Sequence, residues 1–314
     1  MDPIILFFLL GVVVGLCRSD LRLPPAVYEF LVVVLLLAIG MKGGVELADQ
    51  SLLRILPQMA AVVALGFVLP LLAYPVLRSV GRLTRPDAAS IAAHYGSVRV
   101  GTYAVAVGYL AYRSIDYESY APLFVVLLEV PAILVGIMLA RGRSAGVRWG
   151  RLLHEVLLGK SVVLLLGGLL IGWIAGREGI EALAPLFLDS FKGILALFLL
   201  EMGLLAATQA GTLRRHALFL LGFGVAMPLV AALIGAGLSL LLGLSLGGTV
   251  LLTTLSASAS YIAVPAAMRL TVPEANQALS LAASLGVTFP FNVVVGIPIY
   301  HHLATWLHAA IGAV

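Results

Sequence analysis

Long apolar runs separated by short polar stretches dominate the chain. The runs are continuous rather than alternating, which is typical of membrane-spanning helices and not of barrel strands. About 20 apolar residues cross a bilayer as a helix. The pattern therefore predicts ten spanning segments, numbered here in chain order. They are residues 3–17, 24–41, 55–77, 87–111, 120–140, 152–175, 185–207, 216–243, 246–270 and 279–307.

The apolar pattern also predicts an internal duplication. Short motifs recur at nearly one offset: "VLPLLA" matches "AMPLVA", and "VPAILVGI" matches "FPFNVVVGI". The matched pairs are Pro70 with Pro228, Thr102 with Ser260, and Pro131 with Pro290, at offsets of 158 to 159. Five crossings per half would orient residues 1–145 and 146–314 oppositely, as in secondary transporters with inverted repeats. Chance similarity among helices rich in Ala, Leu and Val is the alternative.

Lysine and arginine are distributed unevenly between the connecting loops, which predicts the orientation. The odd-numbered loops carry twelve, namely Arg18, Arg22, Arg78, Arg82, Arg85, Arg141, Arg143, Arg148, Arg151, Arg214, Arg215 and Arg269. The even-numbered loops carry four, namely Lys42, Arg54, Arg113 and Arg177. We therefore expect the odd loops in the cytoplasm, both termini outside, and the chain in a bacterial inner membrane.

Composition narrows the class of protein. Of the 314 residues 61% are hydrophobic and 11% are charged, and the mean hydropathy is +1.11. Soluble domains carry about 25% charged residues, so the lipid bilayer is the expected solvent. The net charge of +4 does not indicate nucleic-acid binding, because the arginines lie in short loops rather than in a stripe. With no Walker sequence and no nucleophile-elbow motif, neither ATP-driven transport nor an enzyme is indicated.

Segments four and nine have unusual polar patterns. Segment four reads "AAHYGSVRVGTYAVAVGY", and segment nine reads "TTLSASASYIAVPAAMR" with serines at 256, 258 and 260. Positions two apart diverge by about 200° on a helix but point to one side of an extended stretch. Both segments are therefore predicted to be broken in the middle. The alternative is that small residues merely let helices pack closely.

Broken helices supply ion-binding groups. Half-helix N-termini favour anions, whereas freed carbonyls and hydroxyls are hard oxygen ligands that suit Na⁺. The predicted substrate-binding residues are Gly96, Ser97, Arg99, Gly101, Thr102, Ser258, Ser260 and Tyr261. The predicted cation-binding residues are Ser256, Ser258 and Glu129, with no other metal and no cofactor expected.

Arg99 is the sharpest single prediction, because a charge in mid-span is costly and marks function. Two partners remain open. The guanidinium could bind an anionic substrate with two hydrogen bonds, or it could pair permanently with Glu129. In the second case Arg99 could occupy the substrate site, and the protein would be an uncoupled, channel-like or sensory membrane module.

Four stretches resemble the sodium-dependent bicarbonate transporter family over nearly the whole chain. They are "AAHYGSV" at 92–98, "LEVPAILVG" at 128–136, "SASASYIAVPAAMR" at 256–269 and "TFPFNVVVGIPIY" at 288–300. The resemblance implies an all-α polytopic membrane protein of two inverted five-helix repeats, with a core and a gate domain and anion and Na⁺ sites between broken helices four and nine. It also implies a homotrimer, bicarbonate as the substrate, and a small PII-like regulatory protein on the cytoplasmic face.

The chain departs from the cyanobacterial members at three places. The serine-glycine-serine-threonine run of segment four is Arg99 to Thr102 here, and the aspartate after the segment-nine serines is Tyr261. The aspartate before the segment-five proline is Glu129. The resemblance therefore favours a secondary transporter of a small anion with Na⁺, but the identity of the anion and the coupling ion are not determined by these residues.

Overall fold

Helices make up the regular structure throughout the described part of the chain. The computed structural model describes residues 3–48, 50, 52–98, 100–142, 150, 154, 156–209, 217–261 and 263–312. The first half contains α1 (Pro3–Leu16), α2 (Pro25–Leu47), α3 (Leu52–Ser79), α4 (Arg85–Gly96), α5 (Val100–Tyr112) and α6 (Ala121–Arg141). The second half contains α8 (Lys160–Glu181), η1 (Pro185–Asp189), α9 (Phe191–Gln209), α10 (Ala217–Leu241), α11 (Leu246–Ser256), α12 (Ala263–Thr271), α13 (Gln277–Leu281), η2 (Ala282–Thr288), α14 (Phe289–Phe291), η3 (Asn292–Gly296) and α15 (Ile297–Ala310).

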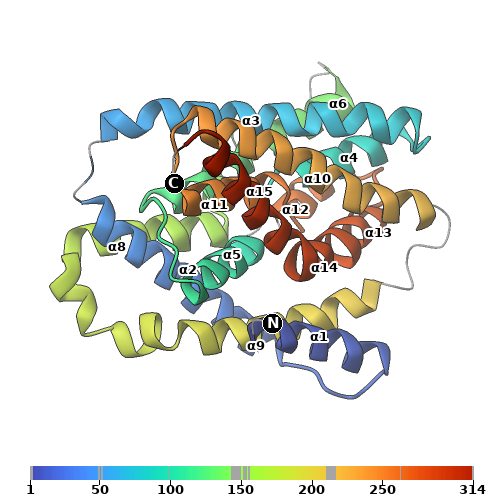
Figure 1. Cartoon of the computed structure of the whole chain (residues 1–314). Helices are drawn as coiled ribbons and strands as arrows, with labels where there is room; N and C mark the ends of the chain where they lie inside the picture. The colour runs from blue at the N-terminus through green and yellow to red at the C-terminus, as the bar shows by residue number, and fades with distance from the viewer. Residues whose placement is uncertain are drawn as a thin grey trace.

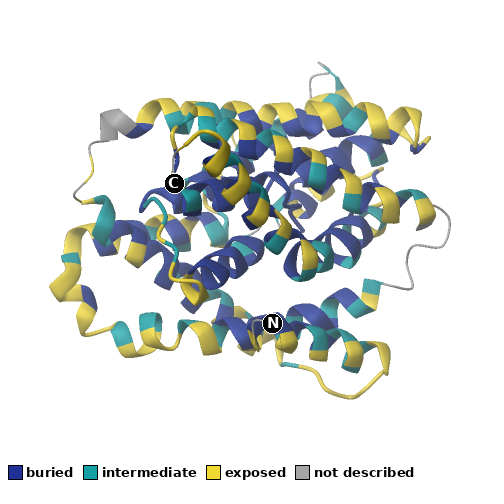
Figure 2. Ribbon diagram, viewed as in Figure 1, coloured by how far each residue is buried: buried dark blue, intermediate teal, exposed yellow. Residues whose placement is uncertain are grey.

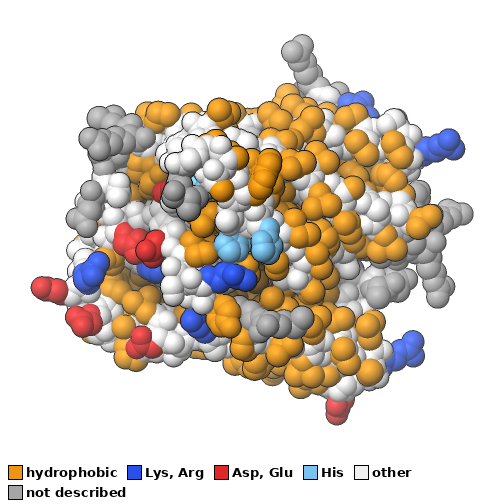
Figure 3. All heavy atoms as spheres, viewed as in Figure 1, with side chains coloured by type: hydrophobic (Ala, Val, Ile, Leu, Met, Phe, Trp, Pro, Cys, Tyr) orange, Lys and Arg blue, Asp and Glu red, His pale blue; other side chains and the backbone are white. Residues whose placement is uncertain are grey.

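Seven of the described helical stretches are long and apolar enough to cross a membrane. The three predicted segments outside this group are short or divided. Helix α1 has 14 residues, segment four is split into α4 and α5, and segment nine is split into α11 and α12. Large apolar side chains cover much of the face drawn in Figure 3, and Leu218 and Leu241 are 87% and 86% exposed. A multi-pass membrane protein is the architecture that buries such a surface, since lipid covers it.

One predicted boundary was wrong for a physical reason. Segment two continues to Leu47 rather than ending at residue 41, because Gly43 and Gly44 extend the helix where it packs most tightly. A Cβ atom on Gly43 would lie 2.8 Å from the carbonyl oxygen of Ser119. The predicted start of segment six, residue 152, lies outside the described residues; helix α8 begins at Lys160, after Gly159 with its extended backbone (ψ 143°).

The helices form two sets. The first, called the four-helix set, comprises α1, α2, α8 and α9, with its most extensive contacts between α2 and α8 and between α1 and α9. The second, called the polar set, comprises α3 to α6 and α10 to α15 and is held by contacts among α3, α4 and α6 and between α10 and α11. In Figure 1 the four-helix set runs along the lower and left sides, and the polar set lies above it. Figure 2 shows the most deeply buried residues within the polar set.

Glycine allows the four-helix set to pack backbone against backbone. On α2, Gly40 faces Gly168 of α8, and Gly44, four residues on, lies against the backbone of Leu169 and Trp173; Gly172 of α8 lies against the backbone of Met41. A Cβ atom on Gly168 would lie 3.1 Å from the Cα atom of Gly40. Gly11 and Gly15 on α1 meet Gly203 and Ala207 on α9 in the same way. Such small-residue pairs are a common way for membrane helices to approach closely.

Candidate functional site

Both predicted helix breaks are present. Helix α4 ends at Gly96, Ser97 adopts an extended backbone (φ −98°, ψ 146°), and α5 begins at Val100. Helix α11 ends at Ser256, and α12 begins at Ala263. The prediction that the alternating serines are non-helical is confirmed for Ser258 and Ser260. It is wrong for Ser256, which is the last residue of α11.

The two breaks touch through backbone hydrogen bonds. The Ser260 N–H donates to the carbonyl oxygens of His94, at 2.8 Å, and of Ser97, at 3.1 Å. In return, the His94 ring nitrogen Nδ1 bonds the carbonyl oxygen of Ser260. A carbonyl can only accept, so Nδ1 is the donor. In an unbroken helix the N–H four residues later would bond the His94 carbonyl, so one break satisfies a group that the other break frees.

Several buried hydroxyl and ring nitrogen atoms lie at the first break or on the helices that flank the two breaks. Five of them have no hydrogen-bond partner within the described residues: His94 Nε2, Ser97 Oγ, Tyr103 Oη, Thr253 Oγ1 and Thr254 Oγ1. Buried polar atoms are nearly always paired, because an unpaired one costs free energy. A small ligand or ordered water at the breaks would supply the missing partners.

Predicted substrate residues also lie where the polar set meets the four-helix set. A Cβ atom on Gly101 would lie 3.0 Å from the ring of Phe198 on α9. The Tyr261 hydroxyl donates to the sulfur of Met202, also on α9, at 3.3 Å. A cavity of about 20 Å³ adjoins Gly101 here, lined by α2, α5, α8 and α9. That volume holds about one water molecule, so this side of the break is closed.

A sequence model of the Na⁺-dependent bicarbonate transporter superfamily matches residues 3–305. The chain belongs to this superfamily. A search of curated proteins gave no match. Membership in the superfamily fits the apolar helices and identifies the chain as a membrane protein of a transporter family. It also agrees with the resemblance that the four sequence stretches predict.

The remaining predicted site residues lie in different surroundings near the two breaks. Thr102 is buried in the first turns of α5, and Gly96 packs against the Pro70 ring of α3 and lies close to Ala132 of α6. The Ser256 hydroxyl donates to the Leu252 carbonyl at 2.7 Å. Its proton is therefore committed, while its lone pairs remain available as acceptors.

Of the two charged residues predicted for the site, the structure describes Glu129 but not Arg99. Glu129 lies midway along α6 and is 6% exposed. Helix α6 packs on both α4 and α11, so this carboxyl group is carried by the helix that contacts both broken segments. Arg99 and Ile262 lie outside the described residues. The role of Arg99 therefore stays a prediction from the sequence.

Asn292 is a site residue that sequence reasoning missed in this superfamily member. Its Nδ2 donates to the carbonyl oxygen of Ala257, the first residue of the second break, at 2.7 Å. Its Oδ1 accepts from the Tyr300 hydroxyl, also at 2.7 Å. Asn292 opens the π-helical turn η3, and such turns are frequent at functional sites. A lone amide in the apolar stretch "FPFNVVVGI" was the available signal.

Proposed function

We propose that this protein is a secondary transporter that moves a small anion, bicarbonate first, together with Na⁺. The observation that carries the proposal is the direct contact between two mid-helix breaks, at which the buried atoms His94 Nε2 and Ser97 Oγ have no partner among the described residues. Helix interruptions in membranes occur where the freed backbone lines an ion or substrate site.

The first break and the start of α5 would bind the anion. Ser97, Gly101 and Thr102 carry hydrogen-bond donors there, and the N-terminus of α5 adds a partial positive charge. Arg99, at the same break in sequence, would add a full charge. The second break would bind Na⁺ through the oxygens of Ser256 and Ser258, with Glu129 as the carboxylate.

Recurring contacts support two inverted five-helix repeats with ten crossings. Glu118, in the loop before α6, accepts from the backbone N–H of Ser245 at 2.6 Å, and Ser245 caps α11. Asp87, at the start of α4, accepts from the backbone N–H of Asn276 at 2.7 Å, and Asn276 caps α13. Each contact joins the start of a broken segment in one half to the loop before the last segment of the other half. A two-fold relation between the halves predicts such reciprocal pairs.

The two helix sets fit the core and gate of the proposed transporter. The polar set carries both breaks and would be the core. The four-helix set, packed through glycine, would be the gate. The homotrimer, the inner-membrane location with both termini outside, and a PII-like partner remain parts of the proposal that rest on the resemblance and on the distribution of lysine and arginine.

Uptake of radiolabelled bicarbonate into proteoliposomes, with and without a Na⁺ gradient, tests the function. Ser258→Ala and Ser260→Ala should weaken the apparent affinity for bicarbonate or Na⁺ by roughly tenfold, since losing a buried hydroxyl partner costs about 1–3 kcal/mol. If both variants keep the parent uptake and ion dependence, the serines only serve packing. Absence of bicarbonate uptake by the parent protein under either condition would refute the proposed substrate.

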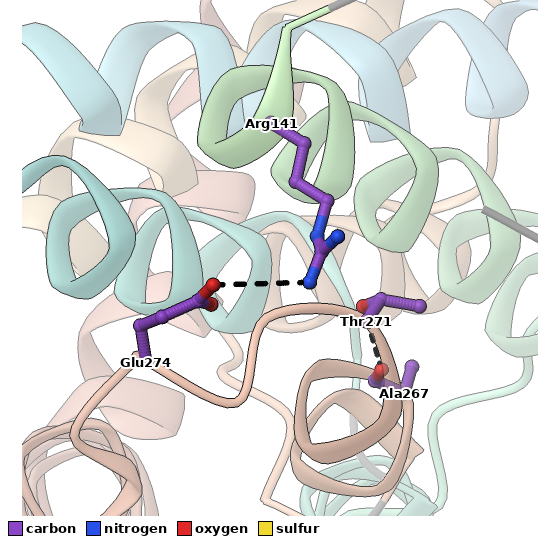
Figure 4. Close-up of polar contacts among 4 residues, drawn as sticks. All are labelled: Arg141, Ala267, Thr271 and Glu274. Carbon is purple, nitrogen blue, oxygen red and sulfur yellow. Dashed lines mark hydrogen bonds and ion pairs between the residues drawn. The ribbon is translucent and has the colours of Figure 1, made fainter. Parts of the chain in front are cut away.

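Thr271→Ala is the matched control. It removes a buried hydroxyl from the same segment, but at the far end of α12, where Thr271 Oγ1 donates to the Ala267 carbonyl at 2.7 Å (Figure 4). Nearby, Arg141 and Glu274 form a loose ion pair at 3.9 Å. This region holds the end of α6 against the loop after α12 and contains none of the proposed ligands. Bicarbonate uptake by Thr271→Ala should therefore match uptake by the parent protein.

A further inference from the structure

A second and larger cavity lies at the other end of α5. Its volume is about 400 Å³, and its wall comes from α2, α5, η1, α9 and Tyr117 of the loop after α5. Three charged residues line it: Lys42, Asp189 and Lys192. The cavity is about twenty times larger than the one beside Gly101. It can therefore hold a small anion with part of its hydration water, which the inner cavity cannot.

The two cavities follow one seam between α2 and α5. On α5, Gly101 and Ala104 line the inner cavity, and Val107 and Ala111 line the outer one. These residues are three or four apart, so they share one face of the helix. Ala111 lies seven positions after Ala104, which is roughly 10 Å along the helix axis. The outer cavity therefore lies directly above the inner one, on the route to the first break.

The charges of the outer cavity favour a weakly held anion. Two ammonium groups face one carboxylate in its wall, and the Lys42 Nζ sits 5.4 Å from the centre of the Tyr117 ring, which helps to place it. Burial raises the pKa of Tyr117, and so do Glu46 and Asp116, whose negative charges thus lie nearby. The wall itself carries a net charge of +1, and these carboxylates outside the wall weaken its attraction for an anion. A site on a transport path must bind well enough to admit an ion and weakly enough to release it.

We propose that this cavity, lined by Lys42 and Lys192, is an outer binding site for a small inorganic oxyanion on its way to the breaks. The inference rests on the proposed function, because it assigns a binding site that the same substrate would occupy before it reaches the breaks. The orientation predicted by the positive residues puts it on the external side. Lysine suits the role, since its compact, strongly hydrated charge attracts an anion without the fixed two-point geometry of arginine.

The test measures the local potential and needs no transport. In a Cys17→Ala background, Ala111→Cys places a single thiol on the cavity wall, and the purified protein in detergent is treated with anionic or cationic methanethiosulfonate. We expect the ratio of anionic to cationic rates to fall about 25-fold in Lys42→Gln and in Lys192→Gln, because the two rates change in opposite directions by about fivefold each for an interaction between unit charges at about 4 Å in water. Lys42→Arg should keep the parent ratio.

Arg177→Gln is the control, because it removes one positive charge from a neighbouring even-numbered loop without changing the cavity wall. It should leave the ratio unchanged. Equal ratios in the parent and in both lysine variants would overturn the outer site, as would a thiol at 111 that reacts with neither reagent.

A second experiment measures transport. Lys42→Gln should raise the KM for bicarbonate uptake and leave the maximal rate unchanged. If the labelling ratio falls but the parent takes up no bicarbonate, the outer anion site stands and the proposed substrate fails. If uptake is present but the ratio is constant, the reverse holds.

Discussion

The two helix breaks occupy matching places in the two halves but are built differently. Within the described residues, the first break comprises Ser97 and Val98, and the second comprises residues 257–261. The second break is braced from outside by Asn292, whereas the first depends on the second for its carbonyl partners. At the first break, His94 Nε2 and Ser97 Oγ have no partner among the described residues. The comparison indicates that the second break braces the contact between the two, whereas the first carries the polar atoms left without a partner among the described residues.

The largest expected effect concerns Arg99, which would give the first break a charge that the second lacks. If Glu129 is its partner, Arg99→Ser should lower the free energy of unfolding by about 3–5 kcal/mol, because one member of a buried ion pair is left alone. The double variant with Glu129→Gln should recover most of this loss. Thermal unfolding in detergent measures both.

Variants of Arg99 also test the other possible partner of its guanidinium, the bound anion. If the anion is the partner, Arg99→Ser should keep the parent stability, and Arg99→Lys should weaken the apparent bicarbonate affinity, since lysine lacks the planar fork. A guanidinium found at the membrane surface, away from segment nine, would contradict both versions.

The next effect tests whether the second break is the support. Asn292→Ala should lower the free energy of unfolding by about 3 kcal/mol, because it leaves the Ala257 carbonyl and the Tyr300 hydroxyl buried without a partner. Asn276→Ala, at the other asparagine, should cost about 1 kcal/mol, the typical value of a helix N-cap. Chemical or thermal unfolding of both variants gives the comparison. Equal losses would show that Asn292 is no special brace.

A smaller effect concerns the side chain that joins the breaks. His94→Ala should lower the free energy of unfolding by about 2 kcal/mol, since the Ser260 carbonyl loses its ring donor but its backbone N–H keeps its bonds. His94→Asn should restore part of the loss, because an amide can also donate. Thermal unfolding measured beside Asn292→Ala ranks the two contacts. A larger loss for His94→Ala would reverse the assignment of supporting and supported break.

The smallest effect changes neither stability nor transport and tests the inversion that makes the two breaks comparable. In a Cys17→Ala background, a cysteine at position 312 should react with a membrane-impermeant reagent added outside, and one at position 146 should not. Labelling of intact cells followed by gel-shift detection reads the pattern. The reverse pattern would contradict the orientation and weaken the case for inverted repeats.

The sequence predicted the breaks because alternating serines are incompatible with one face of a helix. It also predicted the family, because the motifs around residues 92–98 and 256–269 are specific. It did not predict that Ser260 would bond back to His94, since that contact joins residues 166 apart and depends on how the helices cross. Asn292 was missed for the same reason: its value comes from Ala257, which only the fold brings near. The end of α2 was misplaced because glycine usually stops helices, whereas here tight packing retains it.

The glycine contacts of the four-helix set have a mechanical consequence. Helices that meet backbone to backbone leave no side chains between them to rearrange, so the pairs α1–α9 and α2–α8 resist internal shear. The contacts across to the polar set, such as Phe198 near Gly101 and Met202 under Tyr261, involve side chains that can slide and rotate. We therefore expect strain applied to the molecule to concentrate along that boundary, with each glycine-packed pair moving as a stiff unit.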